Sequence, residues 1–143
     1  MDDSGDLGRF VKAQDRDYAR ALAEIRQGRK ESHWIWYIFP QLRGLGYSRN
    51  ASYYGIAGRP EAEAYLQHPV LGPRLIEISR ALLALPGNDA NEIMGDPDDM
   101  KLHSSMTLFS MVKGADKVFE QVLAKFFAGD KDERTVDMLD AAR

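Results

Sequence analysis

The spacing of the apolar residues constrains the fold of this chain more than any other feature of its sequence. Leu75, Ile78, Leu82 and Leu85 follow one another at intervals of three and four. This spacing places their side chains on one face of an α-helix. The same period recurs in the other long apolar segments, and no run of alternating apolar and polar residues predicts a sheet strand. The sequence therefore predicts a mainly α fold, a compact single-domain multi-helix arrangement with short connections.

Residues typical of helix starts occur at several positions along the chain. Side chains of Ser, Thr, Asp and Asn accept hydrogen bonds from the first backbone N–H groups of a helix, and proline fits its first turn. On this basis we expect helix starts at Asp15, Ser32, Ser48, Asn88 or Asp89, Asp96 with Pro97, and Thr135. The apolar faces predict a core that includes Leu75, Ile78, Leu82, Leu102, Met106, Phe109, Val122 and Phe126.

The 143 residues are expected to form one domain, 1–143, in which residues 1–5 are a frayed tail. A chain of this length buries roughly 70% of the surface that it exposes when unfolded, so it needs no disulfide to form a core. The sequence contains no cysteine, which excludes disulfides and cysteine nucleophiles and fits a reducing compartment. Its first residues are acidic and polar, without the apolar segment of a signal peptide. We therefore expect a cytoplasmic protein.

Charge and apolar run length limit the classes of partner. The formal net charge is −3, so a broad basic surface for duplex nucleic acid is not expected. The longest apolar run, WIWYIFP, is far shorter than the roughly 20 residues that a membrane-spanning helix needs. The sequence thus predicts no membrane partner, and it leaves the oligomeric state open.

The stretch SHWIWYIFPQ is the first candidate site. It contains the two tryptophans of the chain, Trp34 and Trp36, with His33 before them and Gln41 after them. Tryptophan faces can hold flat ligands, histidine can titrate near neutral pH, and an amide can bind a polar edge. The alternative is a core-forming helix. Residues two positions apart cannot both face one core on a regular helix, so we expect one tryptophan to be partly exposed or to line a cleft.

The stretch KLHSSMTLF is the second candidate site. Lys101, Ser104 and Ser105 fall on one side of a predicted helix, opposite much of its apolar face. Serine and threonine are mediocre helix formers, so a cluster of them inside a core-like helix indicates buried hydrogen bonding. These side chains could bind a phosphate or sugar, or they could bond to neighbouring backbone groups. We expect the two stretches to lie side by side and to border a common cleft.

Sequence motifs of common enzymes and metal proteins are absent. There is no Walker loop, no HExxH and no GxSxG, and the acidic DPDD segment lacks the ligand spacing of a calcium loop. A Ser-His-Asp triad can be drawn from Ser104 or Ser105, but no motif supports it. The sequence thus predicts no metal and no cofactor, and it leaves open whether the protein is an enzyme.

Several long segments carry a resemblance to a known family. They are RFVKAQD, GRKESHWIWYIFPQLRGLGYS, YYGIAGRPEAEAYLQHPVLGPRL, DDMKLHSSMTLF and FFAGDKDERTVDML. In these segments, from residue 7 to about residue 139, the chain resembles the small bacterial domain-of-unknown-function family number eighteen-ten, some of whose members carry a calpastatin-like label. The resemblance implies a compact helical domain with no established biochemical function. Calpastatin-type inhibitors are disordered and repetitive, which does not match this composition.

A weaker similarity links the chain to the NADAR group, which is associated with NAD and ADP-ribose metabolism. It rests on the order of Ala13-Gln14, residues 58–64 and Lys125-Phe126. The acidic motifs of that group have no clear match here, so the similarity does not imply glycosidase activity.

Two hypotheses follow for function. In the first, the protein binds a small polar or nucleotide-like ligand, with NAD- and ADP-ribose-related compounds among the candidates. The cleft would be built from His33, Trp34, Trp36, Gln41, Lys101, Ser104 and Ser105. In the second, the protein is a protein–protein interaction module with exposed aromatic anchors and no catalysis.

Overall fold

The computed structural model describes residues 4–141, and in them the prediction of a mainly α fold is confirmed. Those residues form nine α-helices and no β-strand. The helices are α1 (Ser4–Arg26), α2 (Ile35–Ile38), α3 (Arg49–Tyr53), α4 (Arg59–Gln67), α5 (Leu71–Leu83), α6 (Ala90–Met94), α7 (Asp98–Ser110), α8 (Val118–Phe126) and α9 (Glu133–Ala141). Of the predicted tail, Ser4 and Gly5 lie in the first turn of α1, and residues 1–3 lie outside the described residues.

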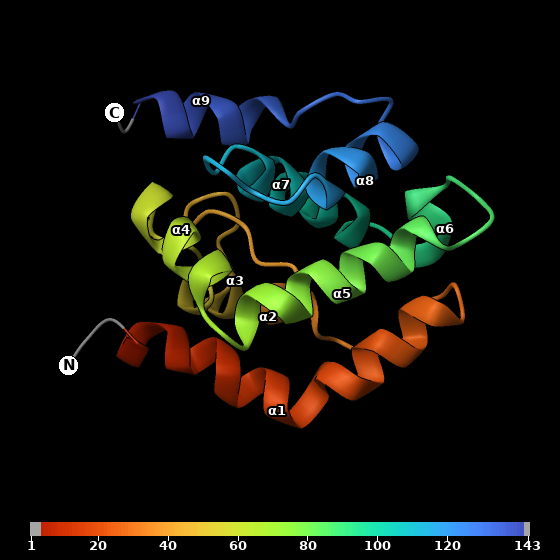
Figure 1. Ribbon diagram of the computed structural model, residues 1–143, viewed down its shortest axis with the longest axis horizontal. Coiled ribbons are helices and arrows are strands. Elements are labelled where there is room, and N and C mark those ends of the chain that lie inside the picture. Colours follow the sequence, from red (N-terminus) through yellow and green to blue (C-terminus); the bar gives the residue numbers. More distant parts are fainter. Residues whose placement is uncertain (1–3, 142–143) are drawn as a thin grey trace.

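The helices pack in an order that follows the chain from one side of the molecule to the other (Figure 1). Helix α1 lies along one side, α5 packs against α1, α4 and α8, and α7 packs against α8, α9, α6 and α2. Helix α9 lies on the side opposite α1 (Figure 1). The short helices α2 and α3 are connected by a loop, and a single bridge pairs Leu42 with Ile56. Helix α2 packs against both α1 and α7, and this contact brings the two candidate stretches together.

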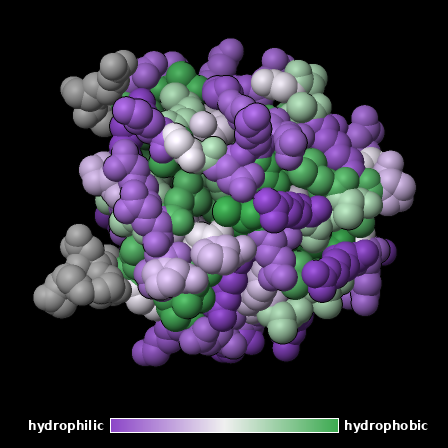
Figure 2. Space-filling model, in the orientation of Figure 1, coloured by the Kyte–Doolittle hydropathy of each residue, from purple (hydrophilic) through white to green (hydrophobic). Residues whose placement is uncertain are grey.

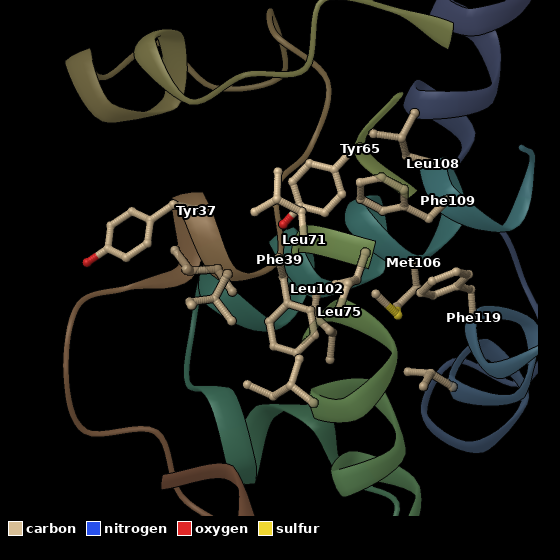
Figure 3. Packing of buried hydrophobic residues seen from close by; sticks show 14 of the residues in the cluster. Tyr37, Phe39, Tyr65, Leu71, Leu75, Leu102, Met106, Leu108, Phe109 and Phe119 are labelled. Atoms are coloured by element: carbon tan, nitrogen blue, oxygen red, sulfur yellow. The ribbon is translucent and has the colours of Figure 1, made fainter. Parts of the chain in front are cut away.

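Aromatic and aliphatic side chains from several helices fill one core (Figure 3). The ring centroid of Phe109 in α7 lies 5.2 Å from that of Tyr65 in α4 and 5.9 Å from that of Phe119 in α8. Of the core residues that the sequence predicts, seven are buried: Leu75, Ile78, Leu82, Leu102, Met106, Phe109 and Val122. The prediction is wrong for Phe126, which is partly exposed because it is the last residue of α8 and lies at the edge of the core.

Two predicted helix caps are confirmed. The Ser48 hydroxyl accepts a hydrogen bond from the Ala51 backbone N–H at 3.1 Å, at the start of α3. The Asp89 carboxylate accepts one from the Glu92 N–H at 3.2 Å, at the start of α6. Each bond gives a partner to a backbone donor that a helix start leaves free.

Four predicted caps are wrong. Asp15 lies inside α1, which continues without a break to Arg26. Ser32 does not cap α2, because its hydroxyl donates to Glu24. Asp96 does not cap α7, where the Asp99 N–H is already bonded to the Gly95 carbonyl. At α9 the accepting side chain belongs to Asp132 and Thr135 is a donor, so the cap lies three residues earlier than predicted.

Candidate functional site

The two tryptophans have different environments, as their spacing predicts. Trp34 is 1% exposed, and its indole N–H donates to the Glu24 carboxylate at 2.9 Å. Trp36, in α2, is partly buried, and its indole Nε1 is buried without a hydrogen-bond partner in the described part of the chain. A buried donor without an acceptor costs about 1–3 kcal/mol. Trp34 is thus satisfied inside the protein, whereas Trp36 leaves one donor available.

Glu24 fixes the loop that carries Trp34. Its carboxylate, on α1, accepts hydrogen bonds from the backbone N–H groups of Glu31 and Ser32, from the Ser32 hydroxyl and from the Trp34 indole, at 2.6 to 2.9 Å. Burial opposes ionisation of this carboxyl, but the hydrogen bonds outweigh burial and lower the pKa of Glu24 to about 2. The carboxylate therefore stays charged and holds the loop against α1.

Two lysines share one carboxylate beside the tryptophans. The Lys30 ammonium lies 4.9 Å from the Trp34 ring centroid and 2.8 Å from Asp98 Oδ2. The Lys101 ammonium lies 5.3 Å from the Trp36 ring centroid and 3.8 Å from Asp98 Oδ1. The Lys30 and Lys101 side chains are 5% and 24% exposed. Two ammonium groups therefore share the Asp98 carboxylate, and the charged Glu24 carboxylate is bonded to the Trp34 indole beside Lys30.

A small cavity of about 10 Å³ lies between α2, α3 and the first turns of α7. It is lined by Ile35, Trp36, Phe39, Gln41, Ala51, Tyr54, Gly55 and Lys101. This is about the volume that one water molecule, or one oxygen of a ligand, requires. The cavity brings together three of the residues that the sequence predicts for a binding cleft, namely Trp36, Gln41 and Lys101.

The remaining predicted residues do not line this cavity. His33 is exposed on the loop before α2, and Trp34 is buried against Glu24. The Ser104 hydroxyl bonds to the Met100 carbonyl and to Asp132, and Ser105 is 0% exposed with a hydroxyl that has no partner among the described residues. The two stretches do lie side by side, but their contact runs through Trp36 and Lys101.

The polar side chains of α7 connect it to the start of α9. The Asp132 carboxylate accepts hydrogen bonds from the Ser104 hydroxyl at 3.3 Å and from the Thr135 backbone N–H at 3.0 Å. The Asp132 backbone N–H donates to the Thr107 hydroxyl at 2.9 Å. The His103 ring stacks on Phe127 with centroids 4.2 Å apart. Most of the serine and threonine pattern in α7 is therefore explained by packing between helices.

Replacing Asp132 by alanine is expected to lower the free energy of unfolding by about 1–2 kcal/mol. The substitution removes the helix cap of α9 and leaves the buried Thr135 hydroxyl without its acceptor, whereas the Ser104 hydroxyl keeps the Met100 carbonyl. Urea unfolding followed by circular dichroism measures the change. Asp130→Ala is the control, because Asp130 is exposed and offers its backbone carbonyl to His103. Equal losses in the two variants would contradict the assignment of the cap.

Sequence reasoning missed two charged residues of the cluster. The residues predicted for the site include neither Lys30, whose side chain is nearly buried, nor Asp98, which belongs to the acidic DPDD segment. A signal was present for Asp98, since it stands three residues before Lys101 and such pairs meet on a helix. The approach of Lys30 to Asp98 depends on the turn after Gly28, whose φ of +84° favours glycine.

A larger groove, of about 700 Å³, lies along α5 and is open to solvent. Figure 2 shows this side of the molecule as a mixture of hydrophilic and hydrophobic residues. Among the charged groups in the groove, Arg80 pairs with Asp116 at 3.5 Å, Glu77 accepts a hydrogen bond from Tyr18 at 2.6 Å, and Arg26 is exposed to solvent. The groove therefore offers space without a polar group that requires a ligand.

Two further tests of the described residues concern metals and membranes. Residues 4–141 contain no group of three or more His, Asp or Glu side chains placed to hold a metal ion. Within the same residues, no helix combines the length and the apolar character that crossing a bilayer requires.

Comparison with known proteins gives a family and a close structural relative. The sequence pattern of the family described as "Protein of unknown function (DUF1810)" matches residues 4–139. The crystal structure of the conserved hypothetical protein Rv1873 from Mycobacterium tuberculosis is similar, with a TM-score of 0.93 and 50% sequence identity. The match covers 96% of this chain and 99% of that protein. No curated protein matches the chain.

Proposed function

We propose that this chain, which belongs to the DUF1810 family, binds a small anionic ligand through an oxygen atom placed in the cavity between α2, α3 and α7. Trp36, Gln41 and Lys101 are the binding residues. The observation that carries the proposal is the unpartnered, buried indole N–H of Trp36 beside the ammonium of Lys101.

Charge supports an anion. The cavity wall contains Lys101, and behind it Lys30 and Lys101 share the single carboxylate of Asp98. A negative oxygen at this position would pair with the Lys101 ammonium, which lies 3.8 Å from Asp98, and charge-assisted hydrogen bonds are about twice as strong as neutral ones. A cationic or purely apolar ligand would gain neither contact.

Size limits how the ligand binds. A cavity of about 10 Å³ accepts one oxygen of a phosphate or carboxylate, so the rest of the ligand must lie on the surface outside it. Gln41 is partly exposed and can bind a polar group at the mouth, while the half-buried faces of Trp36 and Tyr54 offer aromatic surface. This geometry favours phosphorylated sugars and nucleotides, including ADP-ribose and NAD, which the similarity to the NADAR group also suggests. A cytoplasmic location is part of the proposal.

A thermal-shift series with inorganic phosphate, ribose 5-phosphate, ADP-ribose and NAD tests the proposal. A ligand at 100 times its Kd stabilises a protein by about 2.7 kcal/mol, which corresponds to a rise in Tm of roughly 5–10 °C for a domain of this size. We expect at least one phosphorylated compound to reach this shift, and the uncharged ribose to give none. No shift with any of them at millimolar concentration would overturn the proposal.

Three variants locate the binding site. Trp36→Phe keeps an aromatic ring and removes the N–H, and Lys101→Met keeps the aliphatic stem and removes the charge. Each variant should raise the apparent Kd at least tenfold and so reduce the thermal shift. In Lys101→Met the fold should persist, because Asp98 keeps its closer partner Lys30. Lys117→Met is the control, since Lys117 is exposed at the start of α8. A shift that survives in both site variants would place the ligand elsewhere.

A further inference from the structure

The segment from Ser32 to Pro60 contains no aspartate or glutamate, in a chain whose formal net charge is −3. It carries three arginines, at positions 43, 49 and 59, and its exposed large hydrophobic residues are Tyr47, 87% exposed, and Tyr53, 57% exposed. Arg43, Tyr47, Arg49 and Tyr53 are called here the Tyr/Arg surface. The segment therefore has a net positive formal charge in an acidic chain, although one of its arginines, Arg59, lies 3.9 Å from Asp140.

The arginines of this surface keep their charge available. Arg43 and Arg49 are both exposed, and neither pairs with a carboxylate in residues 4–141. The Arg43 guanidinium donates to two neutral acceptors, the backbone carbonyls of Ser52 at 3.2 Å and Gly55 at 3.1 Å. These bonds fix its position and leave the positive charge uncompensated.

Helix α3 fixes the geometry of the surface. Arg49 and Tyr53 are its first and last residues and stand four positions apart, so they are neighbours on one side of the helix. The Tyr53 ring meets the Tyr54 ring edge-on, with centroids 4.8 Å apart. Tyr47 comes directly before Ser48, whose hydroxyl caps α3. Arg49 and Tyr53 are therefore positioned by the helix, with Tyr47 next to its cap.

We infer that the Tyr/Arg surface binds a short stretch of single-stranded nucleic acid. Exposed aromatic rings stack on unpaired bases, and arginines beside them neutralise the phosphates that connect the bases. A duplex hides the faces of its bases and needs a broader basic surface than this one. The inference goes beyond the proposed function and does not require the cavity at Trp36.

Fluorescence anisotropy with a labelled ten-nucleotide oligo(dU) or oligo(dT) tests the inference. At low salt we expect saturable binding with a Kd of about 1–100 µM, and a plot of log K against log salt with a slope of about −1.4 for two phosphate contacts on a single strand. A duplex of the same length should bind at least tenfold more weakly.

Variants of the surface separate stacking from charge. Tyr47→Ala and Tyr53→Ala should each weaken binding by roughly fivefold or more through loss of a stacked base. Arg49→Gln should reduce the salt slope by about 0.7. Arg134→Gln is the matched control, because Arg134 is an exposed arginine on α9. Tyr47→Ala should keep the thermal shift that the cavity proposal expects with phosphorylated ligands, because Tyr47 does not line the cavity, so failure of the cavity proposal and failure of this inference remain distinguishable.

Three results would overturn the inference. The first is no saturable binding of either oligonucleotide. The second is equal weakening by Arg49→Gln and Arg134→Gln, which would indicate an unspecific charge effect. The third is a combination of two observations. Polyglutamate displaces the oligonucleotide at the same concentration of charge, and neither Tyr47→Ala nor Tyr53→Ala weakens oligonucleotide binding. That outcome would identify the surface as a docking site for an acidic protein segment.

Discussion

Replacing Glu24 by alanine is expected to lower the free energy of unfolding by roughly 3 kcal/mol or more. Four donors lose their acceptor at once: two backbone N–H groups, the Ser32 hydroxyl and the Trp34 indole. Glu24 is 8% exposed and Trp34 is 1% exposed, so water cannot replace every lost bond without opening the loop. Hydrogen bonds to a charged acceptor contribute about 1.5–3 kcal/mol each, and such losses are less than additive. Urea unfolding at neutral pH measures the change.

The contribution of Glu24 also depends on pH. Its pKa is lowered from 4.5 to about 2 in the folded protein, so the unfolded state binds a proton more readily. The stabilisation is therefore fully present above about pH 4.5 and is lost as the pH falls from 4.5 to 2. At about 1.4 kcal/mol per unit of pKa, the total is on the order of 3 kcal/mol.

The Glu24→Gln variant isolates this effect. Glutamine keeps an acceptor oxygen and the shape of the side chain but cannot titrate. We expect the difference in unfolding free energy between wild type and Glu24→Gln to shrink by about 3 kcal/mol between pH 6 and pH 2, whatever the other carboxyls contribute. A constant difference over that range would show that the carboxylate does not hold the loop as described.

Replacing Leu82 by alanine is expected to cost about 2–5 kcal/mol, through lost transfer free energy and the cavity left behind. Leu82 is 0% exposed on α5, the helix that packs against α1, α4 and α8. Its carbonyl also accepts a hydrogen bond from the Lys125 ammonium at 3.2 Å, which fixes the end of α5 against α8. Denaturant unfolding of the purified variant gives the loss.

The neighbouring Leu83 provides the matched control. Leu83 is partly exposed on the same helix, so Leu83→Ala removes the same atoms from a less buried site. We expect it to cost about 1 kcal/mol. If Leu82→Ala lowered the free energy of unfolding less than Leu83→Ala does, the side of α5 that faces the core would differ from the one in the structure.

The fold was predictable from the sequence because apolar periodicity depends on the local chain. Leu75, Ile78 and Leu82 lie on one buried face, as their spacing predicts. The helix starts were less predictable, since a serine or aspartate can have partners far along the chain. Ser32 resembles a cap in the sequence, but its hydroxyl bonds to Glu24, which lies one helix earlier. Such partners become known only when α1 and the loop are placed in space.

The candidate site was predictable in part for the same reason. The spacing of Trp34 and Trp36 correctly predicted that their environments differ. The sequence predicted that the stretches containing Trp36 and Lys101 lie side by side, but it did not predict the geometry of their contact. The bond of Ser104 to the Met100 carbonyl follows one of the two alternatives for this stretch, whereas its bond to Asp132, 28 residues away, depends on where the start of α9 lies in space.

The most direct test of the proposed function uses the two tryptophan indole signals in a ¹H–¹⁵N NMR spectrum. The Trp34 indole N–H is already bonded to Glu24 and serves as an internal control, and Trp36→Phe assigns the other signal. During titration with inorganic phosphate and with ADP-ribose, we predict that the Trp36 signal moves downfield and saturates while the Trp34 signal stays in place. A Trp36 signal that does not move with either compound, or two signals that move equally, would contradict the account.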